Sequence, residues 1–378
     1  MMTRKLYAYQ IILIIAITVV VSPLAFAQAR LKDVITTRDN KTKEGEIVKE
    51  DFKFVQITLQ GGGGSESVPL ANIDNIRYDI QVAEWFNAET AWQQKNYKKA
   101  VELYEVLLAK VGQLRVIFKP HIIYKLALSY QALNQLDKAI SLYDTLAKEI
   151  PDNRFCREAS DAEVKCHLAK GDRPGAVKAT EKYKSIFNQI KASDELSYGM
   201  ELLKGDILFV IDPKQARQVY TSLIRDASAY PEIRDSARVG LGRCQLSEKQ
   251  YSDAERNFNE VIKESLAPAV LRGAYTGLGD CYRVAAEKSN TLVDYKKALR
   301  AYLRVNVLYL PQERESIDEY CRASYYAAFC LNIMANFIPD ADKQKQHKEY
   351  AKRIAIELRS SPAFASNEWV KKMEQFVK

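Results

Sequence analysis

The sequence has little of the side-chain chemistry on which enzymes usually rely. Histidine occurs only three times in 378 residues, as His121, His167 and His347, and no two of them are close enough in sequence to share a metal. The patterns H-E-x-x-H, C-x-x-C and G-x-S-x-G are all missing, which excludes the common zinc-peptidase, redox and serine-hydrolase signatures. We therefore expect a protein that is not an enzyme and that uses neither a metal nor an organic cofactor.

A strong excess of one charge is also lacking. The chain has 56 Lys and Arg against 48 Asp and Glu, a formal charge of +8 that becomes +6 without Arg4 and Lys5. This mild excess slightly favours acidic partners or anionic surfaces. Because no stripe of Lys and Arg alternates with aromatic residues, we expect no nucleic-acid binding.

Long apolar runs are missing except at the start of the chain. Arg4 and Lys5 precede an apolar run from Ile11 to Val21, and small residues allow cleavage after Ala27 or Ala29. Residues 1–27 are thus predicted to be a signal peptide, and the protein to be exported, periplasmic or otherwise extracytoplasmic. The alternative is an uncleaved anchor helix, which would be the only membrane contact; an apolar run of about eleven residues is short for a span of roughly 20.

The six cysteines do not form an obvious disulfide framework, although the leader makes disulfides an alternative. Cys166, Cys244 and Cys281 recur at one position of a repeated pattern, which is typical of a packing site. Pairs on one helix, such as Cys321 and Cys330, would lie about 13–15 Å apart, beyond the reach of a disulfide. We therefore predict buried free thiols.

Residues 28–80 differ from the rest and read as a small β-module. Alternating apolar residues and turn signals predict five short strands, and Gly61 to Ser65 form a predicted hairpin tip. The pattern resembles small SH3-like or Sm-like β-barrels. The predicted strands are Asp33–Thr37, Gly45–Lys49, Phe54–Leu59, Glu66–Pro69 and Ile73–Tyr78.

From residue 81 to the end, small and aromatic residues recur at a regular spacing. The segment from Ile123 to Pro151 has Leu126, Ala127, Tyr130, Ala139 and Tyr143, and much of this set returns near Leu241 and Leu278. Such self-similarity predicts stacked helical hairpins. It resembles the tetratricopeptide repeat (TPR) family, which implies a mostly α fold: a right-handed α-solenoid of about seven hairpins over residues 81–378, after the β-module. One Ala position recurs at intervals of 37 to 44 residues, more than the 34 of the family.

In this family the first helices of successive hairpins line a concave groove that holds partner segments. Matching the groove positions onto this sequence gives candidate protein-binding residues, each of which could instead pack against the neighbouring hairpin. The candidates are His121, Tyr124, Leu128, Gln131, Tyr198, Glu201, Arg243, Asp280 and Arg283.

The resemblance implies a non-catalytic scaffold of the bacterial cell envelope that binds extended segments of other envelope proteins or peptides; the sequence leaves self-association open. The alternative is a glycan-active envelope enzyme or enzyme subunit, with its site where the β-module meets the first hairpin. Trp85, Trp92, Glu84 and Glu89 would serve such a site. The two tryptophans lie seven residues apart on one helix face, so they could equally pack the β-module onto the helices.

Overall fold

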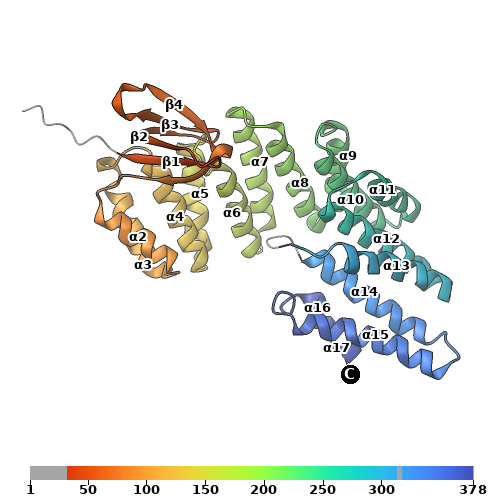
Figure 1. The fold of residues 1–378 in the computed structure, drawn as a ribbon. Coiled ribbons are helices and arrows are strands. Elements are labelled where there is room, and N and C mark those ends of the chain that lie inside the picture. The colour runs from red at the N-terminus through yellow and green to blue at the C-terminus, as the bar shows by residue number, and fades with distance from the viewer. Residues whose placement is uncertain (1–31, 313–316, 378) are drawn as a thin grey trace, which may run out of the picture. The chain divides into compact units, whose positions relative to one another are not determined.

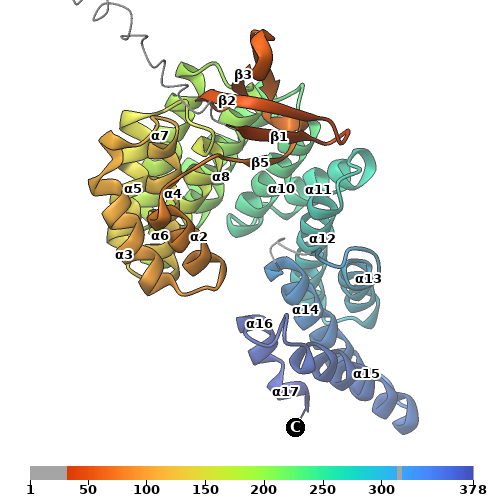
Figure 2. The same cartoon turned by 60° about the vertical axis from the view of Figure 1, so that its left-hand side comes forward.

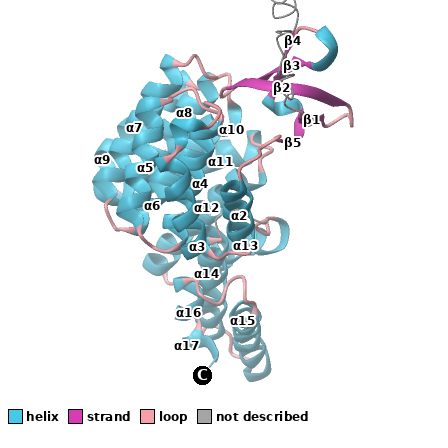
Figure 3. Ribbon diagram, turned by 90° about the vertical axis from the view of Figure 1, so that its left-hand side faces the viewer, coloured by secondary structure: helices cyan, strands magenta, loops and turns pink. Residues whose placement is uncertain are grey.

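The structure is a computed structural model, and it describes residues 32–312 and 317–377. The predicted signal peptide lies outside the described residues. The chain forms two compact units, which divide between Arg157 and Glu158. Unit 1 combines the β-module with the first helices, and unit 2 is helical (Figures 1 and 3).

The β-module is one five-stranded antiparallel sheet with the order β4-β3-β2-β1-β5. One face of the sheet buries Ile35, Ile47, Val55 and Ile57, which alternate with more exposed residues as the sequence predicted. Gly45 is required where β2 pairs with β3, since a Cβ atom there would lie 2.0 Å from the carbonyl oxygen of Thr58. The strands are β1 (Asp33–Thr37), β2 (Thr42–Glu50), β3 (Phe54–Leu59), β4 (Ser65–Pro69) and β5 (Ile73–Arg77).

Two buried polar clusters join this sheet to the helices of unit 1. In the first, Arg115 lies 2.5 Å from Asp33 of β1 and donates to the carbonyl of Ile47 at 2.7 Å. In the second, Nε2 of His121 lies 2.6 Å from the Glu50 carboxylate at the end of β2. Both clusters bind the sheet to the region of one helix, α4 (Phe118–Ala132). Unit 1 therefore extends beyond the predicted β-module and includes the first hairpins.

The described helices from residue 83 to residue 360 form seven antiparallel pairs, which confirms the predicted class of a helical-repeat solenoid preceded by a small sheet. A short C-terminal pair, α16 and α17, packs on α15. The pairs are α2 (Ala83–Gln93) with α3 (Tyr97–Ala109), α4 with α5 (Leu136–Glu149), α6 (Cys156–Ala169) with α7 (Arg173–Gln189), α8 (Asp194–Ile211) with α9 (Pro213–Asp226), α10 (Pro231–Ser247) with α11 (Tyr251–Glu264), α12 (Pro268–Ser289) with α13 (Leu292–Leu308), and α14 (Asp318–Ala335) with α15 (Ala341–Ser360); α16 is Glu368–Lys372 and α17 Glu374–Val377.

In several hairpins a small residue on the first helix meets an aromatic ring on the second. A Cβ atom on Gly279 would lie 2.5 Å from the ring of Tyr302, and one on Gly205 would lie 2.7 Å from that of Tyr220. Ala88 and Ala127 take the same position in earlier hairpins and are fully buried. The recurring small and aromatic residues are therefore a packing rule for these helices.

All six cysteines lie among the described residues, and each is a buried free thiol, as predicted. Burial raises the pKa of Cys281, Cys321 and Cys330 to about 12. Such thiols carry almost no thiolate at neutral pH, so they act as small apolar side chains.

Candidate functional site

The first helices of the later hairpins form a continuous surface in unit 2. Helix α8 packs on α10, α10 on α12, and α12 on α14, in addition to the contacts within each hairpin. Figure 2 shows the succession α10, α12 and α14. We call the solvent-facing side of these four helices the inner face.

A row of tyrosine hydroxyl groups supports carboxylates on the first helices. Tyr220 of α9 donates to Asp206 at 2.7 Å, and Tyr302 of α13 donates to Asp280 at 2.7 Å. The same arrangement occurs in hairpins where Tyr104 donates to Glu89 and Tyr183 to Glu163, at 2.5 and 2.9 Å. In each case the acidic residue comes directly after the small residue, in the sequence, against which the tyrosine ring packs. The rings thus hold acidic groups in fixed positions from behind.

Cations from neighbouring helices face these carboxylates on the inner face. Arg322 of α14 lies 2.5 Å from Asp280 and 2.8 Å from Glu319. Burial opposes ionisation of Glu319, but the charges of Arg322 and Arg243 outweigh it and keep the pKa of this carboxyl below its usual value. Desolvation by the surrounding helices raises the pKa of the Asp206 carboxyl, although the hydrogen bond from Tyr220 and the charge of Arg243 act in the opposite direction.

Two of the predicted arginines are held against aromatic rings. The guanidinium of Arg243 lies 4.7 Å from the ring centre of Phe209, and that of Arg283 lies 4.5 Å from that of Tyr326. Arg243 is about one-third exposed and lies 3.8 Å from Glu319 across the inner face. Of the predicted residues, Arg243, Asp280 and Arg283 are therefore brought together in one region of alternating charge.

The other two predicted residues of unit 2 lie further along α8. The ring of Tyr198 contacts that of Tyr230 at 5.8 Å, and both residues keep part of their surface exposed. Glu201 lies 2.7 Å from Lys184 of α7 and is largely buried. These two side chains belong to the same helix as Asp206 but not to the arginine cluster.

In unit 1 the predicted residues are mostly occupied by packing contacts. His121 is buried and lies beside Glu50 and Tyr78, while Tyr124 stacks on Phe155 at 4.6 Å between ring centres. Gln131 accepts a hydrogen bond from Tyr143 at 3.0 Å, and Leu128 is half-buried. The binding role of these four residues stays a prediction.

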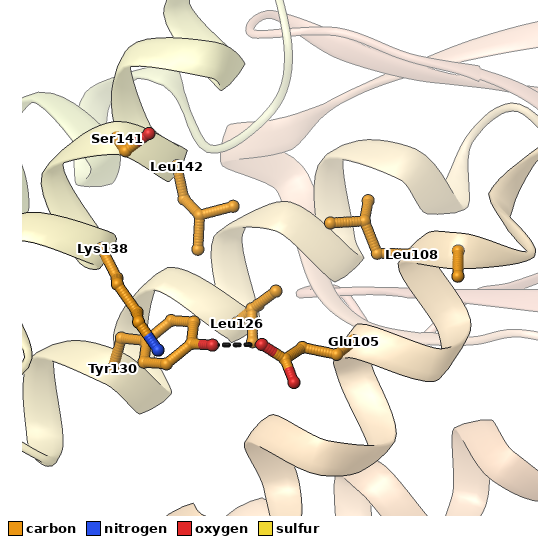
Figure 4. Close-up of a pocket in the computed structure, with 8 residues that line it drawn as sticks. Glu105, Leu108, Leu126, Tyr130, Lys138, Ser141 and Leu142 are labelled. Atoms are coloured by element: carbon orange, nitrogen blue, oxygen red, sulfur yellow. Dashed lines mark hydrogen bonds between the residues drawn. The ribbon is translucent and has the colours of Figure 1, made fainter.

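Unit 1 has a hollow among α3, α4 and α5. Sequence reasoning missed it because its residues are spread over three helices. The hollow has a volume of about 600 Å³, with Leu108 and Leu142 on either side of it. Figure 4 shows that Tyr130 donates a hydrogen bond to Glu105 there, and Nζ of Lys138 lies 4.8 Å from the tyrosine ring centre. Burial and the charge of Glu105 raise the pKa of Tyr130 to about 12.

The predicted alternative site, where the sheet meets the first hairpin, is mainly a packing region. Trp85 is buried against Phe118 and His121, and beside it lies an apolar cavity of about 290 Å³. Glu84 pairs with Lys110 at 3.1 Å, while Glu89 accepts from Tyr104 and lies 3.5 Å from Lys125. The ammonium of Lys125 covers the ring of Trp92 at 3.6 Å. Both carboxylates thus have ionic or hydrogen-bond partners within the fold, and both indole rings are packed against other side chains, while the buried Nε1–H of Trp92 has no hydrogen-bond acceptor among the described residues.

Two further properties concern the described residues as a group. None of their helices combines the length and apolar character that a membrane-spanning segment needs. Within the same ranges, no group of three or more His, Cys, Asp and Glu side chains is placed to hold a metal ion.

Several known proteins are similar to this chain. The RNA polymerase-associated protein CTR9 of Caenorhabditis elegans is 24% identical over 264 residues, which are 67% of this chain and 22% of that protein; this chain thus spans about a fifth of its relative. A tetratricopeptide repeat protein from Parabacteroides merdae is similar in structure, with 12% identity, a TM-score of 0.49 and coverage of 78% of this chain and 97% of that one. The C-terminal part of a TPR repeat-containing protein from Cytophaga hutchinsonii has 16% identity, a TM-score of 0.45 and coverage of 77% and 98%. Residues 122–153, which coincide with the hairpin that the sequence pattern matches best, fit the family model, and the chain therefore carries a tetratricopeptide repeat.

Proposed function

We propose that this protein is a non-catalytic scaffold of the cell envelope, which holds an extended segment of another protein along the inner face of unit 2. The observation that carries the proposal is the continuity of that face: four first helices pack side by side and present Arg243, Arg283 and the tyrosine-supported carboxylates together. Export to the envelope is part of the proposal and rests on the predicted leader.

The rigidity of the side chains on the inner face supports binding. Arg243 and Arg283 are stacked on rings, and Asp206 and Asp280 are bonded to tyrosine hydroxyls, so these groups lose little rotational freedom when a partner arrives. Arginine and tyrosine are also the residue types that contribute most at protein interfaces. Because positive and negative groups alternate, we expect a partner segment with charges of both signs.

The experiment that tests this proposal is affinity capture from cross-linked envelopes with residues 28–378, beside an Arg243→Ala variant. The matched control is Arg256→Ala, because Arg256 lies on the outer helix α11, is about two-thirds exposed and forms an ion pair with Asp253 in its own helix. We expect a partner that the parent and the control retain and the Arg243 variant loses. A partner retained equally by all three proteins would place binding away from the inner face.

A display library of random peptides gives an independent measurement on the purified chain. Peptides selected on the parent protein should compete with the captured partner and should bind the Arg243→Ala variant at least about tenfold more weakly, which is the effect of losing one interface anchor. Selection of no peptide, together with capture of no envelope protein, would contradict the scaffold function.

A further inference from the structure

Helix α13, the second helix of the sixth hairpin, has an unusual solvent-facing side. Its opposite side is fixed in the core by residues such as Tyr295, Ala298 and Tyr302, which are buried. Residues at the spacing of successive helical turns make up the exposed side, within about one-third of the helix circumference. We call this set the α13 outer face: Val293, Lys296, Lys297, Arg300, Arg304, Val307 and Leu308, all of them exposed.

The α13 outer face carries charge of one sign. The helix contains four cations and a single acid, Asp294, which lies 3.1 Å from Lys297. Lys296 and Arg300 have no ion pair with any residue in the described ranges. The guanidinium of Arg304 lies 5.2 Å from the ring centre of Tyr275, which holds this side chain in place. Most of the positive charge on this face is therefore available to a partner.

Exposed aliphatic side chains flank these cations. Val307, Leu308 and Leu310 at the end of the helix are 77%, 62% and 59% exposed, and Val293 at its start is 63% exposed. Such exposed side chains project from the surface and do not line a hollow. Exposed aliphatic groups next to unpaired cations indicate a binding surface when they occur together on one helix.

The outer helix of the preceding hairpin provides an internal comparison. Helix α11 has more acidic than basic residues, Arg256 pairs with Asp253, and none of its large aliphatic side chains is exposed. The next outer helix, α15, also carries cations on one side, with Ile356 exposed among them and one acid, Glu349, on the same side; the cations are Lys345, Lys348, Lys352 and Arg359. Both α13 and α15 pack against α14. The outer helices α7 and α9 also have more cations than acids, but none of their large aliphatic side chains is exposed. The combination of cations with exposed aliphatic side chains therefore distinguishes α13 and α15 from α7, α9 and α11.

We propose that the α13 outer face, extended by α15, docks on the surface of a bilayer that contains anionic phospholipid. The cations would meet headgroup phosphates, and Val307, Leu308 and Leu310 would enter the boundary between headgroups and acyl chains. Contact over two helices and projecting aliphatic side chains favour a lipid surface over a peptide, which would need a hollow to receive its own side chains. The contact is peripheral and does not depend on the scaffold function or on a retained leader.

The test is co-sedimentation of residues 28–378 with vesicles of phosphatidylcholine alone and of phosphatidylcholine mixed with phosphatidylglycerol. We expect binding to the mixed vesicles only, and weaker binding as salt is added. A Lys296→Glu/Arg300→Glu variant should bind at least about tenfold more weakly, because it loses two attractive charges and gains two repulsive ones. The matched control, Arg256→Glu/Lys263→Glu, makes the same change in net charge on α11 and should bind like the parent.

A Leu308→Ser variant tests the aliphatic part without a change in charge, and it should reduce binding to the mixed vesicles severalfold. Circular dichroism melts of all variants should match that of the parent, because the substituted side chains are exposed. Equal loss of binding in the α11 and α13 variants would overturn the proposal, since net charge alone would then explain attraction. Absence of binding to mixed vesicles would also overturn it. In that case, binding to poly-glutamate that is lost in the α13 variant would show that the face recognises an acidic peptide instead of a lipid surface.

Discussion

The same repeat positions are covered in one unit of this protein and open in the other. In unit 1 His121, at a groove position of α4, is buried against Glu50 and Tyr78 of the chain's own sheet. In unit 2 Arg243, at a groove position of α10, contacts the neighbouring helices α8 and α14 and keeps about one-third of its side chain exposed. The comparison teaches that a groove position in a helical repeat becomes a packing position where another part of the chain docks on it.

The largest effect that we expect comes from Arg115→Ala, which would break the attachment of the sheet in unit 1. Asp33 is fully buried, and the substitution removes its guanidinium partner, at a cost of about 3–5 kcal/mol. Hydrogen exchange resolved by segment should show loss of protection in β1, β2 and the α4 region. Arg38→Ala, at an exposed position near the end of β1, is the control and should leave exchange unchanged.

Unit 2 should keep its protection in the Arg115→Ala variant, because its hairpins have their own cores. Loss of protection in both units at once would show that the sheet stabilises the whole solenoid, and the contrast between the units would then be wrong.

A smaller effect is expected in unit 2 from Gly279→Ala. The new methyl group would lie 2.5 Å from the ring of Tyr302, and the resulting overpacking costs about 1–3 kcal/mol. The control is Gly199→Ala in α8, where a Cβ atom meets nothing within 4 Å. That change should stabilise the helix by up to about 1 kcal/mol. Thermal unfolding of the two variants should therefore shift in opposite directions, and a shift in the same direction would contradict the packing rule.

Removal of one supporting hydroxyl should have a still smaller effect. Tyr302→Phe keeps the ring but leaves Asp280 without one donor, and we expect a loss of about 1 kcal/mol because Arg322 still pairs with the carboxylate. Phe258 fills the equivalent position in the fifth hairpin, so the ring alone is sufficient for packing. Urea unfolding measures the difference, and a Tyr302→Phe variant as stable as the parent would show that the hydroxyl has no separate role.

The smallest effect that we expect is on the pH dependence of stability, to which Glu50 and Asp206 contribute in opposite directions. Burial opposes ionisation of Glu50, but His121, Arg154 and Tyr78 outweigh it and lower its pKa. Glu50 therefore stabilises unit 1 at pH values above 4.5, the usual pKa of a glutamate. This contribution is lost as the pH falls through the lowered pKa of Glu50 in the folded protein. The pKa of Asp206 is raised instead, so protonation favours the fold there.

Urea midpoints followed by tryptophan fluorescence at several pH values would report on unit 1 in a Trp369→Phe background, which keeps Trp85 and Trp92 of unit 1 and removes the tryptophan of unit 2. A Glu50→Gln variant should show a lower midpoint at neutral pH and a weaker fall in acid than the parent. The same fall in both proteins would mean that other groups control the acid response.

Much of the architecture could be predicted from local sequence patterns. The strands Asp33–Thr37 and Phe54–Leu59 have the predicted bounds, because alternation of buried and exposed residues is a property of adjacent positions. Gly279 and Tyr302 were also readable as repeat positions. Asp280 was predicted as a groove residue, but its hydrogen bond from Tyr302 was not, and Asp206 was missed. The signal, an acid directly after the small residue as in Gly205-Asp206 and Gly279-Asp280, was visible in the sequence.

The sequence by itself determined the helical hairpins, the strands and the buried thiols, since each follows from the spacing of apolar and small residues along a short stretch. Only the tertiary structure decided that His121 lies against Glu50, 71 positions away, and that Arg243 of α10 lies near Glu319 of α14. It also decided which cations of α13 lack partners. Such outcomes depend on contacts between residues far apart in the chain, and the spacing of residues within one helix contains no information about them.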